Sequence, residues 1–334
     1  FAQSFEVHAS DEVEPGRVSR QLKGVYRVLT RGGGYDAVGK RSLGREANGF
    51  PVVGDWVACA PPGPGSEQGQ IRAVLDRRTC FSRKAAGEAT AEQVVAANVD
   101  TVFVVTGLDG DFNVRRLERF LVAVHESGAD PVVVLNKADL VDDPASYAAE
   151  ARACSPGMPV VVLSATLGIA IGELEAWLQP GRTVALVGSS GVGKSTLVNA
   201  LVGHEAMETG AVRESDDRGQ HTTSFRQLLT TPGGALVLDN PGIRELQAWS
   251  AEVGEAETFS DIEELSASCR FRNCSHCNEP GCGVLGALED GSLGSDRWES
   301  YQKIRAEQKS LEEKKAERMQ IQASYRKAVR QKRG

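Results

Sequence analysis

The sequence has no long run of apolar residues and no recognisable signal peptide. Although 41% of its 334 residues are hydrophobic, none of its apolar runs approaches the roughly 20 residues that a membrane-spanning helix needs. These absences argue against a membrane protein and predict a cytoplasmic chain. A length of 334 residues allows two or three domains. Because the first residue is Phe1 rather than methionine, we expect the natural N-terminus to lie further upstream.

An overall excess of positive charge is also missing, since the formal net charge is −7. Such a balance argues against nucleic-acid binding, but the charge is unevenly distributed. Residues 17–84 contain 13 Lys and Arg against 5 Asp and Glu, and residues 296–334 contain 12 against 6. Residues 85–295 carry a net charge of −17. The sequence therefore predicts an acidic centre between two basic ends, either of which could contact RNA phosphates.

A glycine-rich loop at 188–195 reads Gly-Ser-Ser-Gly-Val-Gly-Lys-Ser, between an apolar run at 183–187 and a helix-like segment at 196–202. This is a phosphate-binding loop in the strand–loop–helix context that it requires. Backbone N–H groups and the helix N-terminus would hold phosphate oxygens, Lys194 would reach the β- and γ-phosphates, and Ser195 would hold Mg²⁺. The expected phosphate-binding residues are Gly188, Ser189, Ser190, Gly191, Val192, Gly193, Lys194, Ser195 and Thr196.

The tetrapeptide Asn136-Lys137-Ala138-Asp139 follows another apolar run, at 131–135. Asp139 can accept two hydrogen bonds from guanine, whereas adenine would leave its carboxylate unsatisfied. We expect Lys137 to lie along the base and Asn136 to brace the loop. This short pattern is common by chance, but a second one supports it. Ser164-Ala165-Thr166, after an apolar run at 159–163, is similar to the GTPase loop whose backbone contacts guanine O6.

Two switch segments follow the phosphate loop. Asp239 and Gly242 belong to an Asp-x-x-Gly sequence after a strand-like run at 235–238, where Asp239 would hold Mg²⁺ through water and the Gly242 N–H would sense the γ-phosphate. Residues 219–223 suit the first switch, with Thr222 or Thr223 on Mg²⁺. The base-reading tetrapeptide thus precedes the phosphate loop by about 50 residues, the reverse of the usual order. Five elements in one cyclic order predict a circularly permuted GTPase domain of the α/β P-loop class.

The residue after Gly242 is Ile243, where many GTPases have a glutamine that orients the attacking water. Because isoleucine cannot orient a water molecule, another group must do so. His221, inside the first switch, is the best local candidate for this catalytic role. The alternative is an ordinary histidine of a surface loop.

Four of the seven cysteines lie within fourteen residues, in the pattern Cys-x4-Cys-x-His-Cys-x4-Cys. The other three cysteines lie far apart in the sequence, which is typical of ordinary buried thiols; they are Cys59, Cys80 and Cys154. A disulfide framework is the alternative for such a cluster, but GTP chemistry places the chain in a reducing compartment, which favours one structural Zn²⁺. The alternative that Cys277 is a zinc ligand in place of His276 remains open. The chosen ligands are Cys269, Cys274, His276 and Cys282.

The first basic segment has the pattern of an all-β domain. Apolar or alternating runs at 24–29, 51–58 and 70–75 are separated by glycine- and proline-rich stretches at 31–34 and 61–65. Short strands over about 70 residues suit an OB-fold barrel, which often binds RNA and in which Tyr35 and Trp56 are candidate stacking side chains. A barrel with only a packing role is the alternative.

The C-terminal segment, 297–333, contains no proline and reads as helix. From Gln320 onward it has five basic residues and no acidic one, which suits RNA phosphates.

Taken together, these segments resemble the RsgA (YjeQ) family of small-ribosomal-subunit-dependent GTPases over nearly the whole chain. Besides the nucleotide motifs, the resemblance rests on Val-Gly-Asp-Trp-Val at 53–57, Ala-Ala-Asn-Val-Asp at 96–100, Gly-Gln-His-Thr-Thr at 219–223, Asp-Asn-Pro-Gly-Ile-Arg at 239–244 and the Cys/His segment at 269–282.

The resemblance implies an N-terminal OB-fold RNA-binding domain (1–84), a permuted GTPase domain (85–250) and a mostly helical zinc domain (251–334). It also implies GTP hydrolysis stimulated by the small ribosomal subunit, contact with its rRNA and a role in late maturation of that subunit; we expect a monomer. The family's catalytic histidine corresponds to His221, and its zinc ligands to the four chosen above. Asn240 and Cys277 depart from the family pattern.

Overall fold

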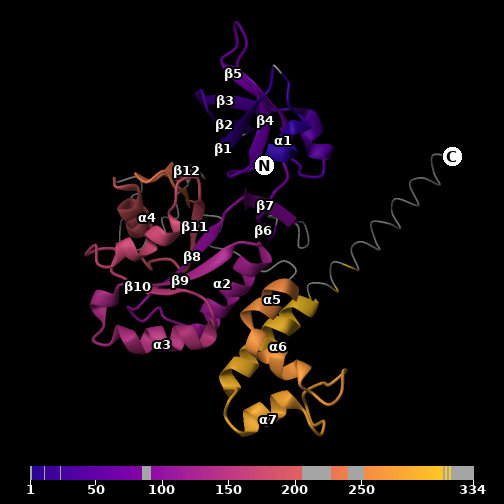
Figure 1. The fold of residues 1–334 in the computed structure, drawn as a ribbon, viewed down its shortest axis with the longest axis vertical. Coiled ribbons are helices and arrows are strands. Elements are labelled where there is room, and N and C mark those ends of the chain that lie inside the picture. The colour runs from indigo at the N-terminus through magenta and orange to yellow at the C-terminus, as the bar shows by residue number, and fades with distance from the viewer. Residues whose placement is uncertain are drawn as a thin grey trace, which may run out of the picture.

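The computed structural model describes residues 2–10, 12–22, 24–84, 92–204, 227–239 and 252–310, together with residues 313 and 316. Three regions follow one another along its longest axis: a β-barrel at one end, an α/β region in the middle and a helical region at the other end (Figure 1). Within the described residues, none of the helices is long and apolar enough to cross a membrane.

Five strands form the N-terminal barrel, after a short helix α1 (Ala2–Glu6). The pairing runs β1–β2–β3–β5–β4 and returns to β1; β3 and β5 are parallel, and every other pair is antiparallel. This closed five-stranded arrangement is that of an OB-fold, so the predicted barrel is confirmed. The strands are β1 (Glu14–Leu22), β2 (Val25–Thr30), β3 (Gly33–Gly39), β4 (Trp56–Ala60) and β5 (Gln68–Val74), with a 3-10 turn η1 (Arg41–Arg45) after β3.

The barrel strands differ in extent from the runs expected from the sequence. The run at 51–58 becomes a strand only from Trp56, because the buried carboxylate of Asp55 accepts a hydrogen bond from Val52 N at 2.8 Å and makes a turn there. Strand β1 was not expected at all. Val18 packs in the barrel core, but its neighbours Arg17 and Ser19 are polar and also buried, so the sequence lacks the apolar alternation of a strand.

The central region is a six-stranded sheet in the order β10–β9–β8–β11–β13–β12, parallel except for β12. A single pairing of Arg20 with Gln227 joins β12 to β1, so the sheet continues into the barrel. The predicted α/β P-loop architecture is confirmed. The strands are β8 (Thr101–Gly107), β9 (Asp130–Asn136), β10 (Val160–Val162), β11 (Thr183–Val187), β12 (Gln227–Thr230) and β13 (Leu236–Asp239), preceded by a separate hairpin of β6 (Cys80–Lys84) and β7 (Glu92–Ala97).

Helices cover both faces of this sheet. Val102 and Val104 of β8 pack in the same core as helices α2 (Val114–Glu126) and α3 (Pro144–Cys154), whereas the alternate residues Phe103 and Val105 pack with α4 (Lys194–Val202) and the 3-10 helix η3 (Ile171–Trp177). A strand buried on both faces is apolar at every position, which is why β8, β9 and β11 were recognisable from the sequence.

The C-terminal region is helical, as expected. It contains α5 (Glu252–Thr258), α6 (Ser260–Ala267), α7 (Gly283–Glu289) and a helix over 295–310. Its core includes Phe259, Ile262 and Tyr301, and Val122 of α2 packs into the same core. Helix α5 lies against α2 so closely that a Cβ on Gly254 would be 2.3 Å from Val122 O. The basic segment beyond Gln320 lies outside the described residues.

Candidate nucleotide site and metal cluster

The glycine-rich loop connects β11 to α4, as the sequence predicted. Gly188 has φ +146° and Gly193 has φ +92°. A Cβ at Gly188 would lie 2.1 Å from Val105 O, and one at Gly193 would lie 2.4 Å from Asn136 Nδ2. Any side chain at these positions would push the loop away from β8 and from the base-reading segment. Lys194 Nζ donates to Gly188 O at 2.8 Å and also to Ser189 O, so its ammonium lies within the curve of the loop.

Asn136 connects the three nucleotide segments that the sequence singled out. Its side chain is buried; Nδ2 donates to Val192 O of the glycine-rich loop at 2.8 Å, and Oδ1 accepts from Ala165 N at 2.9 Å. These two partners fix the orientation of the amide. Loops that are separate in sequence are therefore held in one place at the carboxyl edge of the sheet, where α/β proteins bind ligands.

The second base-reading loop is built around Ser164, which is buried. Its backbone exchanges two hydrogen bonds with Ile169, at 3.1 and 3.0 Å, and its hydroxyl accepts from Leu167 N at 3.3 Å. Ala138 N donates to Leu163 O at 3.1 Å, which holds this loop against the first base-reading segment. Asp139 follows in the 3-10 turn η2 (Ala138–Leu140), where it is exposed.

An acidic residue that sequence reasoning missed lies beside Lys137. The Lys137 ammonium contacts the carboxylate of Asp109 and lowers the pKa of that carboxyl below its usual value. Leu108 N donates to Asn136 O at 2.9 Å, which keeps the Asp109 segment against the base-reading loop. Lys137 itself has a left-handed backbone, with φ 63°. The sequence signal for Asp109 was Gly-Leu-Asp-Gly at 107–110, which begins at the last residue of the apolar strand β8 and so lies at the same sheet edge.

Several predicted residues are not placed. Asp239 ends β13, beside β11, but its side chain is not described. His221, Thr222, Thr223 and Gly242 lie outside the described residues.

The second constellation lies in the loop between α6 and α7. The ligand atoms of its four members are all within 4.8 Å of one another. Cys269 Sγ is 3.8 Å from Cys282 Sγ, and His276 Nδ1 is 3.6 and 3.3 Å from those two sulfurs. A tetrahedral Zn²⁺ with bonds of about 2.3 Å to sulfur separates its ligand atoms by about 3.5 to 3.8 Å. The donor set therefore fits zinc. Its members are Cys269, Cys274, His276 and Cys282, the four chosen from the sequence.

The backbone around this cluster supports the same geometry. His276 has φ 56°, a left-handed conformation that turns its ring toward the three cysteines. The Glu279 carboxylate accepts hydrogen bonds from the N–H groups of Ser275 and Cys277, at 2.8 and 3.0 Å, and fixes the turn. Gly283 N donates to Cys269 Sγ at 3.3 Å, which would stabilise a negative sulfur. Cys277 is exposed and not part of the cluster.

These features together define a class of protein: a P-loop GTPase in which the base-reading strand β9 precedes the phosphate strand β11, flanked by an OB-fold barrel and a Cys₃His cluster. The chain belongs to the RsgA GTPase family, because the sequence model of that family matches residues 74–249.

Individual relatives of known name or structure support the same family assignment. The small ribosomal subunit biogenesis GTPase RsgA of Opitutus terrae is 49% identical, over 92% of this chain and 87% of that protein. Its namesake from Methanosarcina acetivorans is 46% identical, over 90% and 81%. The crystal structure of YjeQ from Thermotoga maritima superposes with a TM-score of 0.66 at 29% identity, covering 89% of this chain and 98% of the other. YloQ, a circularly permuted GTPase, gives 0.61 at 26% identity, covering 91% and 97%. The permuted GTPase predicted from motif order is confirmed.

Proposed function

We propose that this GTPase is stimulated by the small ribosomal subunit, binds its rRNA and acts in late maturation of that subunit. The observation that carries the nucleotide part is the side chain of Asn136, which joins the phosphate loop to both base-reading loops. The ribosomal part is supported by relatives that are named for biogenesis of the small ribosomal subunit and align over about nine-tenths of this chain. We also propose that the protein acts in the cytoplasm as a monomer.

In this proposal guanine is read by Asp139, while the stem of Lys137 lies along the base and the backbone of Ser164 and Ala165 faces O6. The loop from Gly188 to Thr196 surrounds the phosphates. Ser195, Asp239 and one of Thr222 and Thr223 would hold Mg²⁺, which would supply positive charge against the β- and γ-phosphates. Gly242 senses the γ-phosphate. Both switches loosen when the γ-phosphate is lost on hydrolysis.

We assign the orientation of the attacking water to His221. An imidazole can accept a hydrogen bond from water, which Ile243 cannot. We expect His221→Ala to lower subunit-stimulated turnover by a factor of about 10² to 10⁴, the usual range for a positioned acid–base group, with GTP affinity unchanged. Turnover at the wild-type rate in the presence of small subunits would remove His221 from the mechanism.

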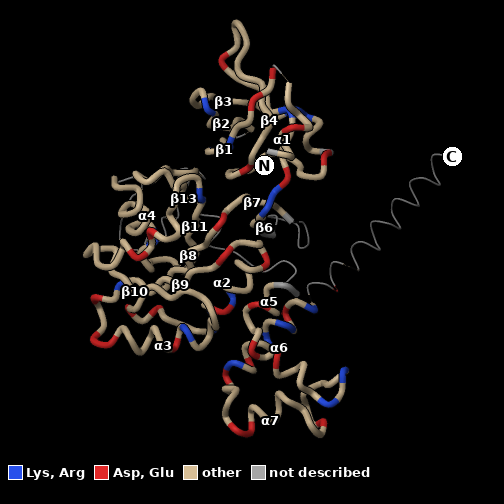
Figure 2. The backbone as a smooth tube through the Cα atoms, viewed as in Figure 1, with Lys and Arg blue, Asp and Glu red and all other residues tan. Residues whose placement is uncertain are grey.

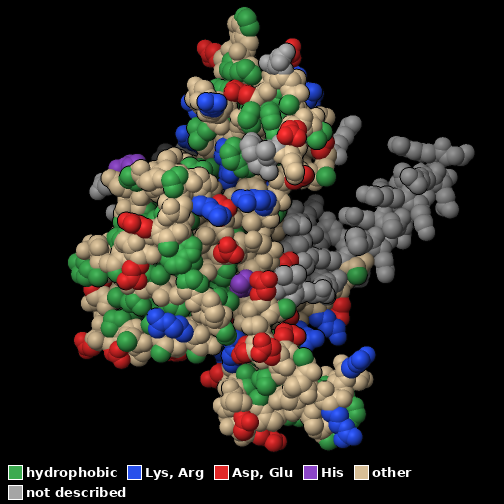
Figure 3. Space-filling model, in the orientation of Figure 1, with side chains coloured by type: hydrophobic (Ala, Val, Ile, Leu, Met, Phe, Trp, Pro, Cys, Tyr) green, Lys and Arg blue, Asp and Glu red, His purple; other side chains and the backbone are tan. Residues whose placement is uncertain are grey.

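Two surfaces support contact with RNA. Lys and Arg side chains lie among acidic ones on the visible face of the barrel, and some gather at its junction with the central region (Figure 3). The loop of the metal cluster projects from the helical region (Figures 1 and 2) and exposes Arg270, Phe271 and Arg272 side by side. Phe271 is 42% exposed, and the Arg270 guanidinium lies 5.5 Å from its ring. An exposed aromatic ring with an arginine on either side in the sequence suits stacking and phosphate contact with RNA.

The test is GTP turnover by the full chain with purified small subunits, with large subunits as the control. We expect a rise in kcat with small subunits only, together with competition by GDP and none by ATP. A rate near zero that small subunits leave unchanged would instead favour an RNA-binding scaffold with a structural nucleotide. One equivalent of zinc in the purified protein is expected alongside, because the Cys₃His geometry fits that metal.

A further inference from the structure

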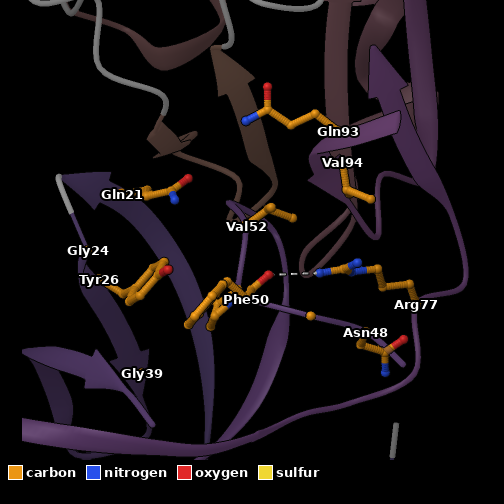
Figure 4. Close-up of a pocket in the computed structure, with 12 residues that line it drawn as sticks. Gln21, Gly24, Tyr26, Gly39, Asn48, Phe50, Val52, Arg77, Gln93 and Val94 are labelled. Carbon is orange, nitrogen blue, oxygen red and sulfur yellow. Dashed lines mark hydrogen bonds between the residues drawn. The ribbon is translucent and has the colours of Figure 1, made fainter. Parts of the chain in front are cut away.

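A cavity of about 660 Å³ opens where the barrel meets the hairpin of β6 and β7 (Figure 4). It lies outside the nucleotide site and the metal cluster. Its walls come from the ends of β1, β2 and β3, from the loop before β4 and from β7. The volume falls within the range of small-molecule sites, roughly 300–1,000 Å³, and exceeds what one nucleobase needs. Residues used in the argument below are Gln21, Tyr26, Phe50 and Arg77.

Phe50 is the large apolar side chain at this cavity, and 53% of it is exposed. Its ring rests on two glycines: a Cβ at Gly44 would lie 2.7 Å from the ring, and one at Gly39 would lie 3.8 Å from it. The lack of side chains beneath the ring lets it lie close to the backbone and leaves its other side open. The ring is therefore supported from below and available from the cavity, which is the arrangement of a stacking platform.

Polar groups stand around this ring. Arg77 is held by Asp55, to which Nε and Nη2 donate at 2.8 and 2.7 Å, and Nη2 also approaches Phe50 O at 3.4 Å. Among the described residues, Arg77 Nη1 has no hydrogen-bond acceptor. Because Asp55 fixes the guanidinium, its position beside the ring costs no further loss of side-chain freedom on binding. On the other side, the cavity is lined by Gln21 and by Tyr26, which is 3% exposed.

We propose that this cavity receives a single unpaired RNA base, which stacks on Phe50 while Arg77 Nη1 donates to an acceptor on the base edge or on the adjoining phosphate. This inference deepens the proposed function and rests on its RNA contact. An RNA ligand is favoured over a peptide because residues 17–84 carry 13 basic and 5 acidic side chains, and because the cavity offers one ring face and a cation. Stacking is available to every base, so we expect little sequence preference.

The direct test uses the full chain and a short oligoribonucleotide that contains one 2-aminopurine, whose fluorescence falls when it stacks. Wild-type protein should quench the single strand, and the same oligonucleotide in a duplex should show no such quenching. Phe50→Ala should raise the Kd for the single strand on the order of tenfold, as loss of one stacked base does. The slope of log Kd against log salt should stay the same, since no phosphate contact is removed.

Three further variants keep the result unambiguous. Phe50→Trp retains a π-face and should bind at least as tightly as wild type. Phe50→Leu keeps apolar bulk over Gly39 and Gly44, so the barrel should fold, but it should bind as weakly as Phe50→Ala. Leu29→Ala is the matched control: Leu29 is 38% exposed on β2 of the same barrel and does not line the cavity, so its removal should change nothing.

Wild-type affinity in Phe50→Leu, equal losses in Leu29→Ala, or equal quenching of the duplex would each overturn the proposal. Chemical probing of rRNA in small subunits adds a second measurement: one base should be protected by wild type and Phe50→Trp and reactive with Phe50→Leu. If subunits neither bind nor stimulate the wild-type protein while single-strand quenching still depends on Phe50, the proposed ribosomal function fails and the base site stands. If subunits stimulate the wild-type and Phe50→Leu chains alike and neither quenching nor protection changes, only the base site fails.

Discussion

Single side chains hold the nucleotide site together across long stretches of sequence. Asn136 reaches Val192 and Ala165, which are 56 and 29 residues away, and the absence of a side chain at Gly193 makes the first contact possible. If the amide were removed, the buried carbonyl of Val192 and the N–H of Ala165 would both lose their partner, at about 1–3 kcal/mol each. Changing the order of strands along the chain therefore leaves the site intact as long as these contacts between loops form.

Asp109 supplies the first residue-scale prediction. Its carboxylate contacts the Lys137 ammonium, and in the proposed guanine site this contact would leave the aliphatic stem of Lys137 to lie along the base. Asp109→Asn removes the charge and keeps the shape, so we expect GTP and GDP to bind about threefold to tenfold more weakly, as befits a partly exposed ion pair. The measurement is the Kd of a fluorescent GDP analogue in wild-type and variant proteins.

Asp111→Asn is the matched control, because Asp111 lies in the same loop but pairs with Arg116 of α2 at 2.9 Å. It should leave nucleotide affinity unchanged, and Asp109→Glu should restore most of the loss. If Asp109 acts through Lys137, its substitution has no further effect in a Lys137→Met background. Additive losses in the double variant would show that Asp109 acts by another route.

The residues found from sequence alone share one property: a short stretch of consecutive sequence is enough to recognise their chemistry. The glycine-rich loop, the base-reading tetrapeptide and the Cys/His spacing are of this kind. Asp109 and Phe50 were missed because their roles depend on partners that only the fold brings near. Tyr35 and Trp56, chosen from sequence as stacking side chains, are engaged within the barrel: the Tyr35 hydroxyl bonds Glu14 and Cys59, and Arg17 lies over the Trp56 ring at 4.8 Å.

At the scale of elements, helix α2 connects the sheet to the C-terminal helices. One side packs on the sheet through Leu117 and Leu121, and the other carries Glu118, which is fully buried. Arg297 Nη1 donates to Glu118 at 2.8 Å, and its other nitrogens donate to Asp261 of α6 at 2.7 Å. Ser300 Oγ completes the cluster on Glu118. No short sequence pattern predicts this cluster, because Glu118 and Arg297 are 179 residues apart in the sequence.

Substitution of Arg297 should strongly destabilise the folded protein. Arg297→Met leaves the Glu118 and Asp261 carboxylates without their cation, one of them fully buried, so we expect the free energy of unfolding to fall by about 3–5 kcal/mol. Denaturant unfolding followed by circular dichroism measures this. Arg115→Met provides the control, because within the described part of the chain Arg115 makes only exposed pairs, with Asp296 and Glu299, and its loss should cost under about 1 kcal/mol. Equal, small losses in both variants would contradict the argument.

The contact between α2 and α5 should depend on pH. Burial lowers the pKa of His125 below its usual value, against the opposing effect of Glu257, which bonds Nδ1 at 2.6 Å. Nε2 is buried without a partner among the described residues, so protonation would bury an unpaired N–H. The folded state thus prefers neutral histidine. Its contribution to stability is present above the unfolded pKa of about 6.5 and is lost as pH falls through the folded value.

We therefore expect wild-type stability to decrease between pH 7 and pH 5, and His125→Gln to show a smaller decrease over the same interval. The measurement is the difference in unfolding free energy between the two pH values for each protein. A steeper loss in the variant than in the wild type would contradict this assignment.

For the whole molecule, the strand order places the last described GTPase strand, β13, next to the C-terminal helices in sequence. Asp239 ends β13, and α5 begins at Glu252 and packs directly on α2. The segment predicted to carry the second switch is therefore followed in the sequence by the helices that hold the Cys₃His loop. With the barrel at the other end of the long axis (Figure 1), the GTPase core lies between two surfaces that suit RNA contact. This supports a coupling in which the nucleotide state changes how both ends hold RNA.

Removal of zinc tests that coupling. Cys282 is 7% exposed in the C-terminal core and caps α7, so Cys282→Ser should remove one equivalent of zinc and disorder the loop that presents Arg270, Phe271 and Arg272. Cys277→Ser is the matched control, since Cys277 is exposed and stands outside the cluster, and it should keep both zinc and activity. Because the nucleotide site shares no residue with the loop, stimulation by small subunits should fall in Cys282→Ser far more than turnover without them. Full stimulation without zinc would mean that the C-terminal loop takes no part in the response, and loss of zinc from Cys277→Ser would mean that the ligand set is a different one.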